Sequence, residues 1–254
     1  MKTLSEDHED FPSLYHGLGY INYVRANYIE ALKYDRIAYE IRKQNLPENH
    51  LDIARSSLNL GCDYVRSGNH KAAMELLLEA FRIREEHYGG QDHVNIAIVC
   101  AAIGDNCIHL YDFNKALYFL TRALEMFKRV LPSEHIKISS VLMKIGYLWE
   151  KQEFYDLALQ WYLKGHSMAM KTMPPEHPTL QKYFERIIRF YERLGRIDQG
   201  IAFGNEKVST QLALVSEFHV SVAQIYFTLG DLNIDIEKKL FCYHKALNIW
   251  EKSK

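Results

Sequence analysis

Apolar residues recur along this chain at intervals of three and four, which is the period of an α-helix. The pattern is clearest around Leu58 and Leu77, and it breaks between them at Gly68. Glycine suits the left-handed backbone position that ends a helix. The pattern therefore predicts a helix over 51–66, a short turn, and a second helix over 70–87.

This pair of helices is one unit of a repeat. A junction that ends in histidine recurs at steps of 43, 42 and 42 residues, at His50, His93, His135 and His177. A glycine follows eleven residues after the first three histidines (Gly61, Gly104, Gly146), and an alanine follows twelve residues after each glycine (Ala73, Ala116, Ala158). A fixed period of roughly 20–50 residues is typical of a repeat array, in which each unit packs only on its neighbours.

The same reading predicts helices along the whole chain. The remaining pairs are expected at 11–24 with 28–43, 94–110 with 114–130, 136–152 with 155–172, and 179–194 with 198–215, followed by a last helix over 236–251. The fifth unit is irregular, because Gly200, Gly204 and Lys207 stand where alanine and large apolar residues are expected. His219 lies 42 residues after His177, but the register of Ala223 makes that match a coincidence. The last helix, which carries Ala246 and ends in charged residues, is expected to cap the array.

We therefore expect an all-α protein built as one solenoid of about six stacked antiparallel helix pairs. The expected divisions are an acidic, flexible N-terminus over 1–10, a solenoid over 11–252, and a tail over 253–254. Its units are about 11–45, 50–89, 93–131, 135–173, 177–216 and 217–252.

The small residues inside the helices have a physical purpose. Two helices approach closely only where the facing side chains are glycine or alanine, and large residues then fill the space between units. The pattern Gly61-x2-Tyr64 followed by Ala73-x3-Leu77-x2-Ala80 resembles the tetratricopeptide repeat (TPR). The 42-residue step with its histidine junction resembles the longer repeats of kinesin light chains. This resemblance implies a right-handed superhelix whose concave face, lined by the first helix of each pair, holds peptide segments of partner proteins.

Charge and composition exclude several other classes of protein. The net charge is −1 and the isoelectric point is near 6.9, so the chain has no overall field to attract nucleic acid or an acidic membrane surface. No apolar run reaches the roughly 18–20 residues that span a bilayer. Four cysteines in 254 residues do not make a disulfide framework. We expect a cytoplasmic protein that needs no cofactor, existing as a monomer or in weak self-association.

The resemblance also implies which side chains line the concave face. Those positions are Arg55, Asn59, Cys62 and Arg66 in the second unit, Ile98, Ala102, Asp105 and His109 in the third, Ser140, Lys144, Tyr147 and Lys151 in the fourth, and Lys182, Arg186, Arg189 and Arg193 in the fifth. The four cations of the fifth unit could clamp an acidic peptide or a C-terminal carboxylate, since arginine binds carboxylates through paired N–H groups. The alternative is a solvated stripe with pairing such as Glu185–Arg189.

Other residue types invite a chemical interpretation but fit a structural one better. Zinc ligands must lie about 2 Å from one ion, whereas the repeating histidines of successive units should be on the order of 10 Å apart. Cys100 and Cys107 share a helix face, which favours core packing over redox sensitivity. Cys107, His109 and Asp112 lack the surroundings of a catalytic nucleophile. No pair of acidic residues that could share a site is evident, and no metal site is expected.

The sequence thus favours a non-catalytic scaffold for protein–protein interaction, binding a peptide segment of a partner. One alternative is the accessory or targeting region of a larger multidomain enzyme or motor adaptor. Another is self-assembly, because solenoids with incomplete caps can stack end to end.

Overall fold

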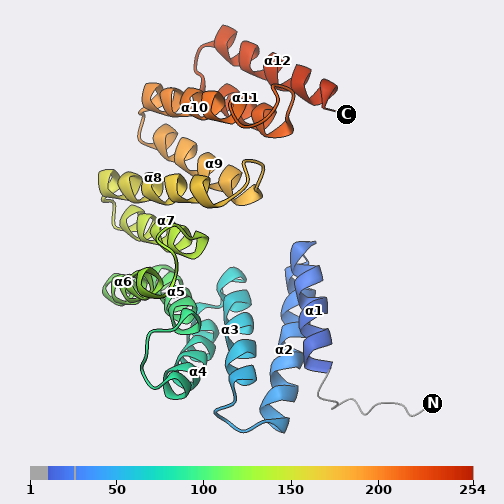
Figure 1. Ribbon diagram of the computed structural model, residues 1–254, viewed down its shortest axis with the longest axis vertical. Helices are drawn as coiled ribbons and strands as arrows, with labels where there is room; N and C mark the ends of the chain where they lie inside the picture. Colours follow the sequence, from blue (N-terminus) through green and yellow to red (C-terminus); the bar gives the residue numbers. More distant parts are fainter. Residues whose placement is uncertain (1–10, 26, 254) are drawn as a thin grey trace, which may run out of the picture. The chain divides into compact units, whose positions relative to one another are not determined.

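A computed structural model describes residues 11–25 and 27–253, and it divides the chain into two compact units, Met1–Pro132 and Ser133–Lys254. The acidic segment expected at 1–10 and the final residue of the expected tail lie outside the described residues. The described part contains twelve helices and no strand, which confirms the all-α prediction (Figure 1). None of these helices is long and apolar enough to cross a membrane.

Unit 1 consists of three helix pairs. They are α1 (Phe11–Val24) with α2 (Tyr28–Asn45), α3 (Leu51–Arg66) with α4 (His70–Tyr88), and α5 (Val94–His109) with α6 (Phe113–Val130). Each pair packs on the next, α2 against α3 and α4 against α5. The core between them contains fully buried aliphatic side chains such as Ile53, Leu77, Ile103 and Leu120.

Unit 2 also consists of three helix pairs. They are α7 (Ile136–Lys151) with α8 (Tyr155–Thr172), α9 (Pro178–Arg193) with α10 (Ile197–Leu212), and α11 (Val220–Leu232) with α12 (Ile236–Lys252). The middle pair differs from the others, since α9 and α10 contact each other less than the helices of any other pair, and α10 packs more on α11. The irregularity expected in the fifth unit is thus a loosened helix pair.

The glycines that recur in the repeat, Gly61, Gly104 and Gly146, sit at close contacts, as their spacing predicts. A Cβ atom added to Gly146 would lie 2.6 Å from a ring carbon of Tyr162, and one added to Gly104 would lie 2.7 Å from Leu120. Both distances are too short for carbon atoms in contact, so any larger residue would push the paired helices apart.

Five of the helices begin with a histidine that caps the N-terminus. The ring Nδ1 accepts a hydrogen bond from the backbone N–H two residues further on, at 3.0–3.2 Å, in His50, His93, His135, His177 and His219. The cap satisfies one of the backbone donors left without a partner in the first turn of a helix. The interpretation of His219 as a coincidence is wrong, because His219 caps α11 as the other four cap their helices.

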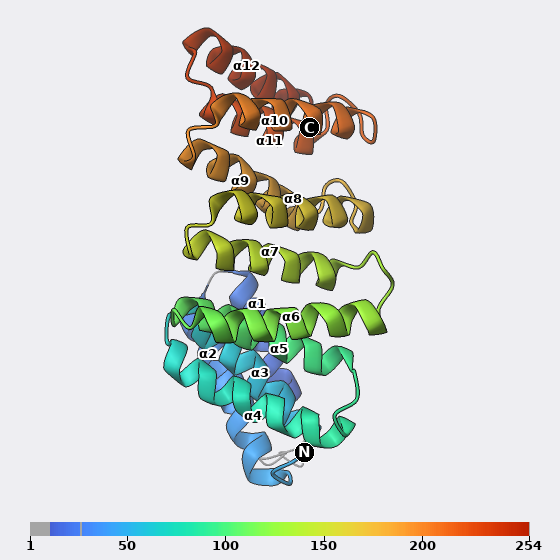
Figure 2. The same ribbon diagram turned by 90° about the vertical axis from the view of Figure 1, so that its left-hand side faces the viewer.

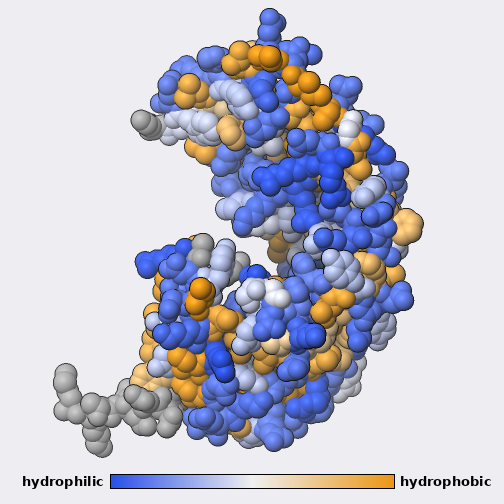
Figure 3. Space-filling model, turned by 180° about the vertical axis from the view of Figure 1, so that it is seen from behind, coloured by the Kyte–Doolittle hydropathy of each residue, from blue (hydrophilic) through white to orange (hydrophobic). Residues whose placement is uncertain are grey.

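The last predicted helix, over 236–251, is observed as α12 and ends in charged residues, but part of its surface is apolar. Figure 3 shows apolar surface over the last helices of unit 2. The exposed apolar side chains there include Phe227, Leu240, Phe241, Leu247 and Trp250. Helix α12 therefore buries Ala246 on one side and presents apolar residues on another.

Candidate functional site

One face of α9 carries four cations, which we call the α9 cationic face: Lys182, Arg186, Arg189 and Arg193. They are spaced by four, three and four residues, so they share one side of the helix, and all four are exposed. The opposite side of α9 buries Phe184, Ile187 and Ile188. The helix is therefore anchored by its apolar side and presents its charges outward.

A carboxylate from α7 holds two of these arginines. The Arg193 guanidinium donates to Glu150 at 2.8 Å, and that of Arg186 donates to the other oxygen of Glu150 at 3.3 Å. The side chain of Glu150 is only 13% exposed, and it also accepts a hydrogen bond from the Tyr162 hydroxyl. Burial, followed by the proximity of Glu150, raises the pKa of Tyr162, although Arg186 opposes the shift, so this hydroxyl keeps its proton and remains a donor.

Aromatic rings lie against Arg186 and against Lys151 of α7. The guanidinium of Arg186 lies 4.6 Å from the centre of the Tyr147 ring and 5.0 Å from that of Tyr162. The ammonium of Lys151 lies 5.3 Å from the Tyr147 ring centre. These distances are within the range of cation–π attraction, so Tyr147, Lys151 and Arg186 form one layered cluster on α7 and α9.

The α9 cationic face borders a cavity of about 400 Å³. Its remaining walls are Glu150, Glu185 and Phe190. Within the described residues, neither Lys182 nor Arg189 has a hydrogen bond or an ion pair. Four cations and two carboxylates line the cavity, so it has a surplus of positive charge and two cations that are available to a ligand.

The pairing of Glu185 with Arg189, expected for a merely solvated stripe, is absent from the described residues. Glu185 instead accepts a hydrogen bond from the side chain of Gln181 at 2.9 Å. Lys144, on α7, is also predicted to line the concave face, and it is half-buried. Lys144 and Tyr147 both have contacts with neighbouring residues.

In unit 1 the predicted residues of α3 have partners within the unit. Arg55 forms an ion pair with Asp52 at 2.9 Å, and Arg66 forms one with Asp63 at 3.2 Å. The amide of Asn59 lies 3.3 Å from ring nitrogens of His16, on α1. The two ion pairs therefore lie within α3, whereas the Asn59 contact links α3 to α1.

The predicted residues of α5 also lie in unit 1. Ile98 and Asp105 are half-buried, and the ring of His109 stacks on His70 with 4.7 Å between ring centres. On the same helix, Cys100 and Cys107 are fully buried. Burial raises the pKa of Cys100 to about 12 and that of Cys107 to about 11. Both thiols are therefore protonated at neutral pH and pack as small apolar groups.

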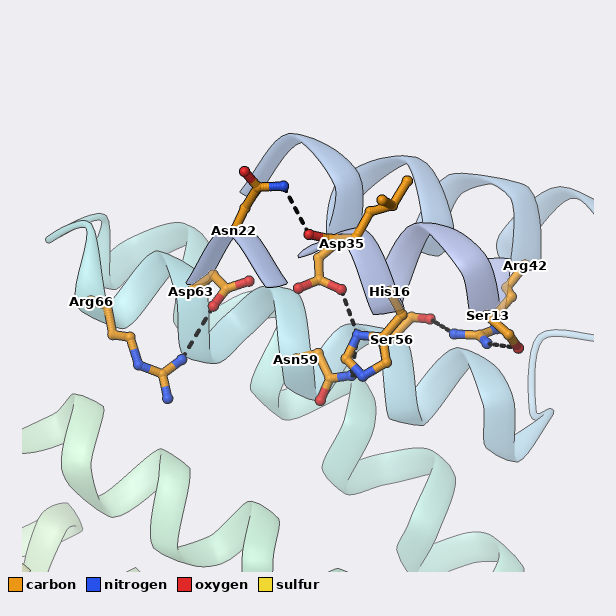
Figure 4. A network of polar contacts seen from close by, with 10 residues as sticks. Ser13, His16, Asn22, Asp35, Arg42, Ser56, Asn59, Asp63 and Arg66 are labelled. Atoms are coloured by element: carbon orange, nitrogen blue, oxygen red, sulfur yellow. Dashed lines mark hydrogen bonds and ion pairs between the residues drawn. The ribbon is translucent and has the colours of Figure 1, made fainter. Parts of the chain in front are cut away.

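Unit 1 does contain a pair of acidic side chains, so the expectation that no such pair exists is wrong. Asp35 on α2 and Asp63 on α3 point toward each other, and His16 lies 2.7 Å from Asp35 (Figure 4). Burial, and secondarily Asp35, raise the pKa of Asp63 to about 7. One Asp63 oxygen, Oδ2, is buried with no hydrogen-bond partner among the described residues. A carboxyl that stays protonated almost to neutral pH relieves the repulsion between the two acids.

The position of Asp35 carried a signal that could have revealed this pair. Asp35 lies four residues after Ala31 and three before Ala38, both of which are buried core residues. An acidic residue on the apolar face of a helix requires a partner. The sequence does not show which helix supplies that partner.

Part of the chain matches a known family. Residues 10–86 match the family model described as tetratricopeptide repeat. The response regulator aspartate phosphatase I of Bacillus subtilis (strain 168) is 26% identical over 186 residues. That alignment covers 69% of this chain, and the chain spans 44% of the relative's length.

Two solved structures share the fold over most of the chain. A Podosopora anserina protein with nearly identical TPR-like repeats, named after kinesin light chain, has a TM-score of 0.63 at 17% identity and covers 81% of this chain and 98% of its own. The Rap conjugation gene regulator of plasmid pLS20, in complex with the Phr* peptide, has a TM-score of 0.62 at 15% identity, covering 100% of this chain and 78% of its own. The helix pairs, their step and these likenesses together show an α-solenoid of tetratricopeptide-like helix pairs, a fold shared with the solved kinesin light chain repeats.

Proposed function

We propose that this protein is a non-catalytic scaffold that binds an acidic peptide segment of a partner protein on the α9 cationic face. The observation that carries the proposal is that Lys182 and Arg189 line a cavity without a partner among the described residues. A peptide carboxylate would supply the charge that this cavity lacks.

The surroundings of the cavity favour such a ligand. Glu150 and the aromatic rings fix Arg186 and Arg193 before any ligand arrives, which lowers the entropy cost of binding. Lys182 and Arg189 are left to form the new bonds, and a guanidinium can bind a carboxylate through two parallel N–H groups. Phe190 gives the peptide an apolar surface at the centre of the cavity.

The comparisons support a peptide as the ligand class. The solved Rap regulator of similar fold holds the Phr* peptide. The predicted residues of unit 1, namely Arg55, Asn59, Arg66, Ile98, Asp105 and His109, are proposed as a separate contact region for the same class of partner. We place the protein in the cytoplasm, where its four free cysteines would stay reduced.

A second candidate function follows from the named relative. Similarity to a response regulator aspartate phosphatase suggests a protein that acts on a phosphorylated response regulator. Loss of phosphate from a phosphorylated receiver domain, measured with and without the protein, tests this function. Turnover by the isolated protein would contradict the non-catalytic proposal.

The peptide proposal is tested on an array of immobilised hexapeptides that carry from zero to four carboxylates. We expect retention of the protein to rise with the number of carboxylates. The best peptide, labelled with fluorescein, then gives dissociation constants by anisotropy. The double variant Lys182→Glu/Arg189→Glu changes only the two unpaired cations and leaves the Glu150 network in place, and it should bind at least tenfold more weakly.

A matched control makes the same change of charge elsewhere in unit 2. Lys238→Glu/Lys245→Glu alters two cations of α12, outside the cavity, and should keep the wild-type affinity. Circular dichroism checks that both variants remain helical. Retention that is independent of carboxylates, or equal affinity of both double variants, would overturn the proposal.

A further inference from the structure

A second cavity of about 800 Å³ lies in unit 2 on the side formed by α8 and α10, which we call the α8–α10 cavity. Figure 2 shows these two helices on the same side of the unit, with α9 behind them. Its apolar walls include Leu163, Met170, Tyr191, Phe203 and Leu214. It shares no lining residue with the cavity at the α9 cationic face, so it is a separate site.

The irregular sequence of α10 explains why this space exists. A Cβ atom added to Gly200 would lie 2.8 Å from Leu232, and one added to Gly204 would overlap the side chain of Leu229. Leu229 and Leu232 belong to α11, so the two glycines let α10 pack closely on that helix. Because α10 is drawn toward α11 and contacts α9 little, its other side leaves space toward α8.

Two buried polar groups face this space without partners. Lys207 is only 7% exposed, and its side chain has no hydrogen bond or ion pair within the described residues. His166 is 3% exposed, and its Nε2 atom is buried without a hydrogen-bond partner. Burial lowers the pKa of Lys207 below its ordinary value, and burial followed by the charge of Lys207 lowers the pKa of His166 to about 4. An unpaired ammonium in such surroundings is costly, and an anion beside it would offset that cost.

The other charged groups of the cavity limit the ligand to a single negative charge. Lys171 is already paired with Glu134 at 2.7 Å. Glu206 is exposed at the edge of the cavity, and its carboxylate would repel a ligand with several negative charges. A cavity of this size and apolar lining is within the range that holds small organic ligands.

We propose that the α8–α10 cavity binds a small amphiphilic monocarboxylate, with its carboxylate on Lys207 and His166 and its hydrocarbon body against Leu163, Met170 and Phe203. The ammonium of Lys207 donates to one carboxylate oxygen. His166, as the neutral tautomer with its hydrogen on Nε2, donates to the other. The aliphatic chain replaces water along the apolar walls.

The probe for this site is sodium decanoate, used below the concentration at which it forms micelles, with decanol as its uncharged counterpart. Isothermal titration calorimetry on the full chain should show decanoate binding at least tenfold more tightly than decanol. Lys207→Met keeps an unbranched side chain, one atom shorter, and removes its charge, and it should reduce decanoate affinity at least tenfold while decanol affinity changes less than threefold. Lys164→Met, on the exposed side of α8 and outside the cavity, should bind decanoate as the wild type does.

A second variant keeps the test decisive if Lys207→Met fails to fold. Ala202→Phe fills the cavity from an exposed position on its wall without touching either polar group, and it should abolish binding of both probes. Equal affinity of decanoate and decanol for the wild type, or unchanged decanoate binding in Ala202→Phe, would overturn the proposal. Neither result bears on peptide binding at α9.

Discussion

The third helix of unit 1 and the third helix of unit 2 occupy equivalent places in the repeat, yet they use their charged residues differently. Arg55 and Arg66 of α3 are paired with acids of their own helix, whereas α9 keeps Lys182 and Arg189 unpaired among the described residues. Both helices begin with a histidine cap and are the first helix of their pair, although the α9–α10 pair is looser than the α3–α4 pair. The two helices differ in which acidic residues lie beside each cation. We expect a cation that is already paired to add little to ligand binding, and an unpaired cation to add most of it.

The largest effect should come from the framework that both units share. Gly146→Val would force a side chain into the Tyr162 ring, and we expect a loss of about 3 kcal/mol in the free energy of unfolding of unit 2. Gly17→Val is the matched change in unit 1, where a Cβ atom meets nothing within 4 Å; it should be neutral or slightly stabilising. Urea unfolding measures both, and equal effects of the two substitutions would contradict the close-packing account.

The next effect separates the units by pH. The pKa of Asp63, ordinarily 3.8, is raised to about 7 in the folded unit 1. The folded state therefore binds a proton more tightly than the unfolded chain, so the free energy of unfolding should fall by about 2.5 kcal/mol as pH rises from about 5 to about 7.5. Asp63→Asn should remove this dependence, whereas the exposed control Asp198→Asn should retain it. Urea unfolding followed by circular dichroism at pH 5 and 7.5 checks the prediction, and identical slopes for wild type and Asp63→Asn would refute it.

Unit 2 should respond to pH in the opposite direction. The pKa of His166, ordinarily 6.5, is lowered to about 4. The unfolded chain binds the proton more tightly, so the free energy of unfolding of unit 2 should rise by about 2 kcal/mol between about pH 5 and about pH 7. All three tryptophans of the chain, Trp149, Trp161 and Trp250, lie in unit 2, so their fluorescence reports this unit. His166→Phe should flatten the dependence while His244→Gln should not; a flat profile in the wild type would speak against the buried neutral ring.

The smallest effect concerns the turns between paired helices. Glu153 adopts a left-handed backbone with φ of 65°, a position that Gly195 fills in the next pair with φ of 67°. The strain of a side chain there costs roughly 1–2 kcal/mol, partly offset by the entropy of glycine in the unfolded chain. Glu153→Gly should therefore stabilise unit 2 by about 0.5 kcal/mol and Gly195→Glu should destabilise it. Tryptophan fluorescence in urea detects both, and stabilisation by Gly195→Glu would be inconsistent with strain.

Much of the fold could be predicted because its signals are local. The helix predicted over 51–66 is observed as Leu51–Arg66, since its histidine cap and its glycine stop are both visible in the sequence. The prediction for His219 is wrong because it follows the alanine spacing through α10, where Gly200 and Gly204 accommodate leucine side chains of α11. The histidine period was the better guide.

The candidate sites depend on contacts that spacing does not reveal. The shared face of Lys182, Arg186, Arg189 and Arg193 follows from helical geometry alone. That Glu150 holds only two of them depends on how α7 lies beside α9, across 36 and 43 residues of sequence. The pairing of Asp35 with Asp63 and the α8–α10 cavity likewise depend on packing between helices, so the sequence gives no direct indication of either.

The comparison of α3 with α9 leads to one decisive measurement. It is the affinity of the protein for the acidic hexapeptide selected on the array, measured after two cations of either helix have been replaced. Fluorescence anisotropy on Lys182→Glu/Arg189→Glu and on Arg55→Glu/Arg66→Glu compares two changes of equal charge. We predict a loss of at least tenfold for the α9 variant and of less than threefold for the α3 variant. Equal losses, or a larger loss for α3, would contradict the claim that unpaired cations make the binding site.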